Sequence, residues 1–555
     1  MIRTADPPLD PGSNPGKRRW AITWGVACLL GVGHGISAPI GLSAAELRIG
    51  LSSMAISADP HARMAQPDYV LAEHVHDSLA GMDASSQPAP ELATSWWMNE
   101  NGDWVFRLRR DVRFQNGDEF TARDVIYSYC RVLGPPGTHH PRTDALADIE
   151  LVTAPDPYTL VIHPHRAMPV FPALLAGIPI AAASPGAQPV YNPAGCADMP
   201  ESAFDPGHRN VGSGPYRILS FSPQRVELQR NPNYWGAAPA WDRVELIRLA
   251  DEERVHGLVQ GRVDVIDAVP SGALAFLRRH AGLRIVVAPS DVLHYLQTNQ
   301  FAEMPAGVDG TGGRNPFRDV RVRQAISHAI DRRLIVERIH GGHGLIATQL
   351  SRPGSGGYDP RIAGEDADRH KARRLLEEAG YGQGFDATIL TVSSLRRSAD
   401  VVAHLLRQIG LRVRVETASN REFWDRIAAG GFSLYYAGWV ASPDSMPATY
   451  RALVGTPDTE RRYGAHNYGG FRSAAIDALV AEAEQSLDAP RRDRLLRQAA
   501  LLLSREGGII PVMYGYGRWG IRANLQMTPR LDQMTLAADI RPLPESPAGL
   551  SGNGR

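Results

Sequence analysis

Residues 104–133 read WVFRLRRDVRFQNGDEFTARDVIYSYCRVL, and this stretch contains both kinds of element from which the chain is built. Residues 104–108 place Trp, Phe and Leu at every second position, which is the period of a half-buried strand. Thr121 then stands in a cap position with Asp124 three residues later, the spacing of a capping box. We therefore expect a helix over 121–133, with these apolar residues on one face: Val125, Tyr129 and Val132.

Strands and helices follow one another on both sides of this stretch, without an internal repeat. The clearest helical pattern runs from Asp319 to Ile339, and Gly341 lies beyond its end. The alternating strand 432–437 precedes Gly438-Trp439, which we expect to begin a loop. The other expected strands are 47–49, 292–298, 411–416 and 509–514, and the other expected helices are 368–379, 399–409, 420–429, 473–487 and 489–505.

Length and charge restrict the class of protein. The chain has 555 residues, of which 43% are hydrophobic. This is too long for one hydrophobic core, so we expect two or three domains. Lysine plus arginine and aspartate plus glutamate both number 59, which gives a formal net charge of zero. The balance argues against nucleic acid or an anionic membrane surface as the main partner, because both attract a basic excess.

The start of the chain has the pattern of an export signal. Residues 17–19 are Lys-Arg-Arg, and an apolar run over 20–32 follows. Ser43-Ala44-Ala45 supplies small residues at a cleavage position, so Glu46 is the expected first mature residue. The run is shorter than the about 20 residues that span a bilayer, which favours a signal peptide, residues 1–45, over a membrane anchor. We expect a periplasmic protein. The Sec route is favoured for its export, and the paired arginines before Trp20 leave the twin-arginine route open.

The cysteines exclude several metal and redox sites. Cys28 lies in the expected signal, where Gly25 fits a lipid-attachment box poorly, so we expect no lipid anchor. No Cys-x-x-Cys occurs, which leaves zinc ribbons and thioredoxin-like sites without support, and we expect no metal and no cofactor. Cys130 and Cys196 are free to pair in an oxidising compartment, but their spacing leaves this open.

Enzyme motifs are absent from the sequence. It contains no Gly-x-Ser-x-Gly, no His-Glu-x-x-His and no Walker lysine. Lys371 is the only lysine of the expected mature chain, which argues against Schiff-base chemistry. His139-His140 is interpreted as a solvated loop pair. We therefore expect a binding protein rather than an enzyme.

Short segments with recognisable spacing follow one another from about Glu46 to about Arg541. They are Asp59-Pro60-His61, Pro90-Glu91-Leu92-Ala93-Thr94-Ser95-Trp96, Phe106-Arg107-Leu108-Arg109, residues 114–118 with 121–125, Gly212-Ser213-Gly214-Pro215-Tyr216, residues 230–235, Gly261-Arg262-Val263-Asp264, residues 320–325 with 329–332, and Ala379-Gly380-Tyr381. In this order they resemble family 5 of the extracellular solute-binding proteins of ABC importers, the oligopeptide-, dipeptide- and nickel-binding family. One segment alone is weak, whereas the ordered set is specific.

The resemblance implies a fold and a domain plan. The fold is α/β, of the periplasmic-binding-protein-like type II class, with two lobes joined by a hinge and an extra small domain inserted in lobe I. The implied parts are lobe I (46–78, 210–290 and 512–541), the inserted domain packed on it (79–209), lobe II (291–511) and a disordered tail (542–555).

The resemblance also implies a function. Such a protein captures a peptide or a similar small polar solute in the cleft between its lobes and delivers it to ABC permease subunits at the inner membrane. We expect a monomer without a nucleic-acid partner. Two alternatives are a binder of a nickel or other metal chelate on the same fold, and a solute sensor that does not transport.

A glycine-tryptophan loop lines the ligand pocket in this family, which points to Trp439. Peptide-binding relatives carry an aspartate three positions later, where it pairs with the ligand amine. Here that position is Ser442, and Asp444 follows two residues further on. A serine cannot neutralise a buried ammonium group, so the amine is expected to be blocked, absent or held by Asp444. An aspartate after Pro443 is equally typical of a turn.

Arg396 precedes the expected helix 399–409, at a position where dipeptide-binding relatives hold the ligand carboxylate. A guanidinium at a helix N-terminus suits an anion, because the helix dipole adds to its charge. Arg397 is the next candidate, and a solvated loop arginine is the alternative. The resemblance assigns further pocket positions to Tyr295, Gln297, Met64 and Gln66.

Overall fold

A computed structural model describes most of the chain, in the ranges 45–62, 66–133, 146, 148–166, 168–183, 196, 211–362, 366–441, 446–459 and 463–544. These residues belong to one compact unit, Ala44–Arg555. The expected signal peptide before Ala45 and most of the expected tail lie outside the described ranges. No helix among the described residues is long and apolar enough to cross a membrane.

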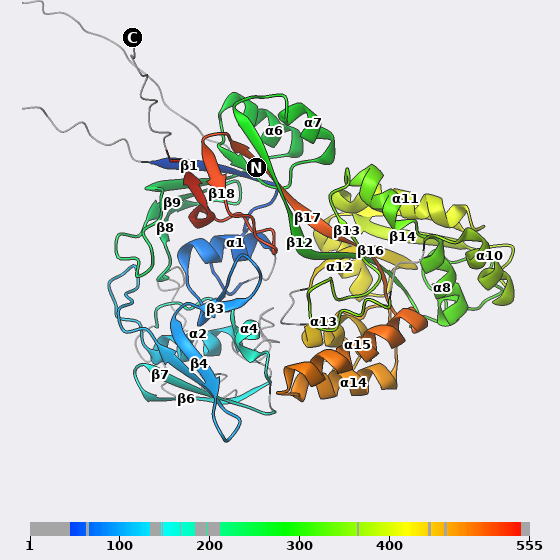
Figure 1. The fold of residues 1–555 in the computed structure, drawn as a ribbon, viewed down its shortest axis with the longest axis horizontal. Helices are drawn as coiled ribbons and strands as arrows, with labels where there is room; N and C mark the ends of the chain where they lie inside the picture. Colours follow the sequence, from blue (N-terminus) through cyan, green and yellow to red (C-terminus); the bar gives the residue numbers. More distant parts are fainter. Residues whose placement is uncertain are drawn as a thin grey trace, which may run out of the picture. The chain divides into compact units, whose positions relative to one another are not determined.

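The described residues contain one large mixed sheet. Its eleven strands are β1 (Glu46–Leu51), β8 (Tyr216–Phe221), β9 (Arg225–Arg230), β10 (Arg243–Arg248), β11 (Val265–Ile266), β12 (Leu283–Thr298), β13 (Leu345–Ile346), β14 (Asp386–Val392), β15 (Arg412–Ala418), β16 (Leu434–Val440) and β17 (Ile510–Arg522). The order is β15-β14-β16-β12-β17-β11-β1-β10-β9-β8, and β13 pairs with β17. The long strands β12 and β17 therefore lie in the middle of the sheet and connect its two halves (Figure 1).

The pairing of β12 with β17 changes in its middle. Residues 283–289 of β12 pair with the later half of β17, and residues 293–296 pair with its earlier half. The register shifts between Pro289 and Leu293. A proline has no N–H to donate, which fits an interruption of the ladder at this point. The two strands thus link two separately packed halves through an irregular crossing, as expected for a hinge.

The lobe I half of the sheet is covered on both faces. One core contains α6 (Asp251–Gln260), the 3₁₀ turn η3 (Ser271–Ala273) and α7 (Leu274–Leu277) and is centred on Leu258 and Leu277. The other core is centred on Leu246 and Trp519. It is closed by α1 (Gln66–Val75), β18 (Leu525–Met527), the 3₁₀ turn η8 (Ala537–Asp539) and β19 (Ile540–Pro542).

The expected inserted domain has a sheet and a core of its own. The sheet order is β4 (Ala93–Met98), β5 (Trp104–Leu108), β7 (Thr159–Pro164) and β6 (Ile149–Asp156). The remaining elements are β2 (Ala80–Met82), β3 (Pro88–Pro90), α2 (Ala122–Leu133) and α4 (Phe171–Leu175). The expected helix start is confirmed, because Thr121 N–H donates to Asp124 Oδ2 at 2.8 Å. Cys130 of α2 forms a disulfide with Cys196, the pairing that the sequence left open.

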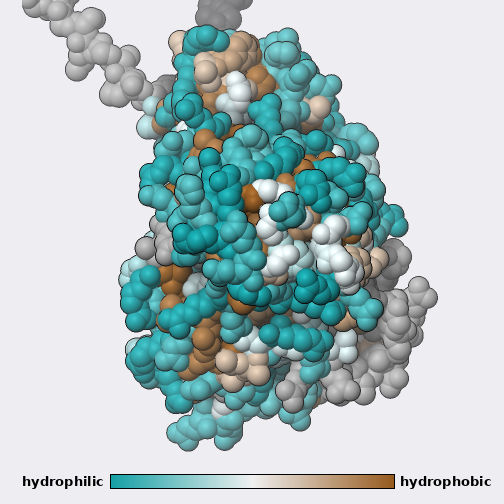
Figure 2. All heavy atoms as spheres, turned by 90° about the vertical axis from the view of Figure 1, so that its right-hand side faces the viewer, coloured by the Kyte–Doolittle hydropathy of each residue, from teal (hydrophilic) through white to brown (hydrophobic). Residues whose placement is uncertain are grey.

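The lobe II half of the sheet lies between two layers of helices (Figure 1). One layer contains the 3₁₀ turn η4 (Pro316–Arg318), α8 (Val320–Ala329), α10 (Arg369–Glu378), the 3₁₀ turn η6 (Ser393–Leu395) and α11 (Arg396–Arg407). The other contains α12 (Asn420–Ala428), α13 (Met446–Val454), α14 (Ala474–Gln485) and α15 (Ala489–Glu506). Neighbouring residues of β16 alternate between the two cores, with Tyr435 on the second and Tyr436 on the first. The face seen in Figure 2 is largely hydrophilic. This is expected, because a surface helix buries one apolar stripe and exposes its polar side chains.

Two sequence-based expectations are wrong. The helix expected over 319–339 ends at Ala329, and a short α9 (Arg332–Leu334) and a π turn, η5 (Ile335–Ile339), follow. Asp331 interrupts the helix because its side chain accepts from Leu334 N–H at 2.9 Å, which starts a new turn. Gly438 and Trp439 do not begin a loop either, because both pair with β12 inside β16. The domain boundaries proposed from the sequence stay a prediction.

Candidate ligand-binding site

The parallel strands of lobe II end at one edge, next to the hinge. Val392 ends β14 beside Ala418 of β15, and Val440 ends β16 beside Val292 of β12. Open α/β sheets bind ligands outside the carboxyl ends of their strands. We therefore expect a ligand site at this edge and at the hinge strands beside it.

A cluster of histidine, tyrosine and arginine side chains lies beside the hinge, and we name it the hinge cluster: His294, His340, His343, Tyr516 and Arg518. The ring of His294, on β12, stands edge-on to that of His340, with centroids 5.9 Å apart. The rings of His343 and Tyr516 have centroids 6.3 Å apart. All five residues are half-buried. Side chains of both lobes thus meet beside the hinge, where a hinge movement would change the distances between them.

Arg518 carries the fixed positive charge of the hinge cluster. Its Nη1 donates to Ser271 Oγ at 2.5 Å. Among the described residues it forms no ion pair, and burial lowers its pKa. An arginine stays charged at neutral pH even so. A half-buried guanidinium with only a hydroxyl partner retains donors for an anion.

The histidines of the hinge cluster are neutral at pH 7. Burial lowers the pKa of His294 to about 3, and the neighbouring His340 and Arg518 act in the same direction. Burial and Arg518 lower the pKa of His340 to about 4. Each ring therefore has one donor and one acceptor nitrogen. His294 Nδ1 is buried without a hydrogen-bond partner in the described structure. Because buried polar atoms are normally hydrogen-bonded, this nitrogen can take a partner from a ligand.

The side chain of α11 that reaches the hinge cluster is Ser398. Its Oγ lies 3.1 Å from His340 Nε2. Arg396 and Arg397, in the first turn of the same helix, are exposed. Arg396 Nε instead donates to Asp400 Oδ1 at 2.9 Å, four residues along the helix. The anchoring role expected for Arg396 or Arg397 stays a prediction.

Trp439 is half-buried near the end of β16. Its ring lies 4.9 Å from that of His466, centroid to centroid, and its Nε1 is 3.5 Å from Thr449 Oγ1 of α13. Ser442 and Asp444 lie outside the described residues. The ring is therefore positioned by lobe II, and its contact with a ligand stays a prediction.

The other expected pocket residues are distributed over both lobes. Tyr295 and Gln297 are 1% and 0% exposed and face the core that contains α12 to α15. Tyr435 Oη donates to Gln297 Oε1, and Gln297 Nε2 donates to Asn467 Oδ1 at 3.1 Å. Gln66, exposed at the start of α1, donates to the Asp532 carbonyl at 3.1 Å. Met64 lies outside the described residues. The structure thus brings none of the three described side chains, Tyr295, Gln297 and Gln66, to the hinge cluster. The roles expected for all four residues stay predictions.

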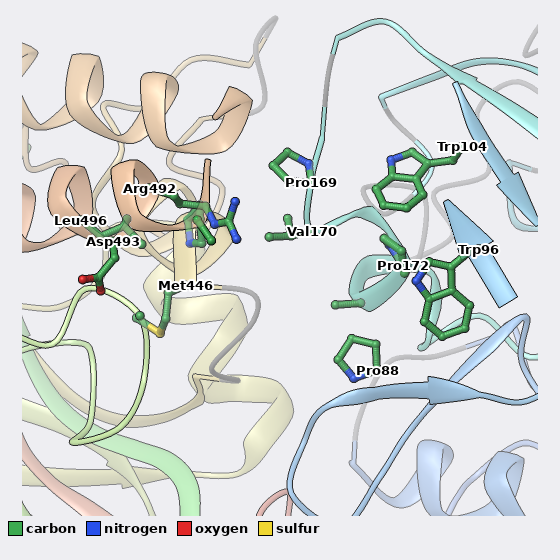
Figure 3. Close-up of a pocket in the computed structure, with 14 residues that line it drawn as sticks. Pro88, Trp96, Trp104, Pro169, Val170, Pro172, Met446, Arg492, Asp493 and Leu496 are labelled. Atoms are coloured by element: carbon green, nitrogen blue, oxygen red, sulfur yellow. The ribbon is translucent and has the colours of Figure 1, made fainter. Parts of the chain in front are cut away.

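A separate cavity of about 320 Å³ lies between the inserted domain and lobe II (Figure 3). Two tryptophans, Trp96 and Trp104, stand on the side of the inserted domain, opposite Met446 and Leu496. Among the described residues no group of three or more histidine, cysteine, aspartate or glutamate side chains is arranged to hold a metal ion.

Sequence reasoning missed Arg518 and His294 for different reasons. The expected strand at 509–514 stopped before Arg518, whereas β17 continues to Arg522 because lobe I supplies partners for it. His294 lies on the strand that was expected, one position before Tyr295, but on the opposite face. Charged or histidine side chains on long apolar strands are the signal that could have drawn attention to both.

Comparison with known proteins gives consistent results. A model of the bacterial extracellular solute-binding proteins, family 5, matches residues 87–460. The periplasmic oligopeptide-binding protein OppA of Escherichia coli K12 is 25% identical over 488 residues, which cover 82% of this chain and 85% of OppA.

Two solved structures share the fold. The dipeptide-binding protein of Pseudoalteromonas sp. SM9913, in complex with Met-Leu, has a TM-score of 0.75 and 22% identity and covers 90% of this chain and 100% of its own. NikZ of Campylobacter jejuni, in complex with Ni(L-His), has a TM-score of 0.74 and 19% identity and covers 89% and 99%. The expected two-lobed, periplasmic-binding-protein-like α/β fold is confirmed.

Proposed function

Because the chain belongs to the bacterial extracellular solute-binding proteins of family 5, we propose that it captures a peptide or a similar small polar solute. The solute lies between the lobes and is delivered to the permease subunits of an ABC importer. The likeness to OppA and to the Met-Leu complex supports a peptide. The protein acts by binding and closure rather than by catalysis.

Export to the periplasm is part of the proposal. Cleavage before Glu46 leaves β1 complete, since that strand begins at Glu46 and buries Leu47 fully. The mass of the protein recovered from the cell envelope tests this step. A chain that begins at Glu46 supports the signal peptide, and an uncut chain confined to the cytoplasm contradicts it.

The solute carries an anionic group, which the hinge cluster receives. The observation that supports this most is Arg518, half-buried and without an acidic partner among the described residues. A carboxylate there accepts a charge-assisted hydrogen bond, and a bond of this kind contributes roughly 1.5–3 kcal/mol. His340 and His294 offer neutral N–H groups beside it. Arg396, Trp439 and the position of Ser442 are assigned to contacts with the rest of the solute.

Calorimetry with a matched pair of ligands tests the proposal. A dipeptide panel that includes Met-Leu is titrated as free acids and as C-terminal amides. We expect the free acids to bind more tightly, and Arg518→Gln to weaken them by about ten- to a hundredfold while it leaves the amides unaffected. Arg522→Gln is the matched control, because Arg522 lies on the same strand but is paired with Asp264. Equal affinity for acids and amides contradicts the assignment of the anion to this cluster.

The same titration separates other candidates. Arg396→Ala tests the anchor expected from the sequence, and Ser442→Asp should improve binding of free-amine peptides if an acid at that position holds the amine. The likeness to NikZ with Ni(L-His) favours a metal chelate as the second candidate ligand, so nickel–histidine is included. Tighter binding of nickel–histidine than of any peptide would replace the peptide proposal.

A further inference from the structure

Four charged side chains meet where the inserted domain faces lobe II. Asp148 and Arg166 belong to the inserted domain and flank its β6–β7 pair, whereas Arg451 lies on α13 and Glu484 on α14 of lobe II. Two contacts cross between these parts, Arg166 Nη1 to Glu484 Oε2 at 3.1 Å and Arg451 Nη1 to Asp148 Oδ2 at 3.4 Å. The two parts otherwise have separate hydrophobic cores.

Each charge also has a partner on its own side. Arg166 Nη2 lies 3.3 Å from Asp148 Oδ2, and Arg451 Nε lies 3.3 Å from Glu484 Oε1. Separation of the two parts would therefore break two ion pairs but leave two neutral pairs intact. No isolated charge is left in either half. This arrangement suits a contact that forms and breaks, because the large cost of stranding a buried charge is avoided.

The lobe II members of the cluster are the better shielded from solvent, since the side chains of Arg166 and Asp148 are 23% and 22% exposed. The Glu484 side chain is 4% exposed and that of Arg451 15% exposed. Tyr463 Oη donates to Glu484 Oε2 at 2.9 Å and covers the same carboxylate. Burial alone would raise the pKa of Asp148, but Arg166 and Arg451 together hold it below its usual value. The lowered pKa of Asp148 and the raised pKa of Arg166 keep both groups charged at neutral pH. The ion pairs of the cluster therefore act in a medium that screens them less than water does.

We propose that Asp148, Arg166, Arg451 and Glu484 form a reversible latch that holds the inserted domain closed against lobe II. The latch adds to the stability of the closed arrangement and slows its opening. The role of this closure in ligand capture rests on the proposed function. The latch itself is tested without any ligand, so that failure of one idea is distinguishable from failure of the other.

Distance measurement between two spin labels tests the latch. In the full chain with Cys28→Ser, labels are placed at Glu100→Cys on the inserted domain and at Arg494→Cys on α15, both exposed positions. The other two cysteines are joined as Cys130–Cys196. We expect one dominant short distance in this background and a larger population of long distances in Glu484→Gln.

The expected change in the ratio of short to long distances is about tenfold or more, since breaking a buried pair is costly. Glu482→Gln is the matched control, because its exposed pair with Arg491, at 2.7 Å, lies wholly within lobe II. Asp148→Asn provides a second variant in case Glu484→Gln does not fold. Distance distributions that are the same in Asp148→Asn or Glu484→Gln as in Glu482→Gln, in folded protein, would overturn the latch.

Discussion

His74 shows how one buried side chain makes stability depend on pH. The residue is 1% exposed, and its Nδ1 lies 2.6 Å from the Val70 carbonyl while Nε2 accepts from Ala537 N–H at 3.0 Å. These two partners require the neutral ring with its proton on Nδ1. Burial lowers the pKa of His74 to about 4, from an ordinary value of 6.5. Between about pH 4 and pH 6.5, the His74 ring therefore binds a proton in the unfolded chain but not in the folded chain.

Protonation of His74 in the unfolded chain should make the protein less stable in acid. The contribution of His74 is fully present above about pH 6.5 and is lost as the pH falls toward 4, by up to roughly 3 kcal/mol. In His74→Gln the amide can still donate and accept but does not titrate. Urea unfolding at pH 7.5 and 4.5 should thus show a smaller acid-induced loss in the variant. An equal loss in both proteins would mean that His74 is not responsible.

Helix ends are set by residues close in sequence, and α15 provides a clear case. Asp488 at its N-cap accepts from Arg491 N–H at 3.2 Å, and Gly507 ends the helix with φ of 64°. Asp488→Ala should lower the free energy of unfolding by about 1 kcal/mol, whereas Asp488→Ser, which keeps an acceptor, should lower it less. Chemical denaturation of both variants measures this. Equal losses in the two variants would show that the cap bond is not the cause.

The same locality explains which elements could be predicted. The helices expected over 368–379 and 420–429 and the buried face of α2 follow from neighbours within four residues, and the structure confirms them. The length of β17 depends on Val265 and Val287, which lie more than 200 residues away in the sequence. Strand ends of this kind are decided by distant partners, so local periodicity cannot locate them.

The arrangement of the whole molecule follows from two strands that serve both lobes. β12 and β17 place lobe I residues such as Arg518 beside lobe II residues such as His294. Family-like segments in the sequence predicted the two-lobed fold, which the solved structures confirm. The ligand class that these segments predict stays a proposal. They did not predict the hinge cluster, because its members come from separate segments that only the crossing brings together. The contacts of Ser442 and Asp444 lie outside the described residues and stay predictions.

In the proposed function, this chain retains a small anionic solute by means of the hinge cluster. Native mass spectrometry tests it most directly, on wild type and Arg518→Gln purified without denaturation and then incubated with a pool of peptides and nickel–histidine. We expect a bound mass on the wild type that belongs to a solute with a carboxylate, and a much lower occupancy on the variant. Retention of an uncharged solute, equal occupancy on both proteins, or no retention from the pool would contradict it.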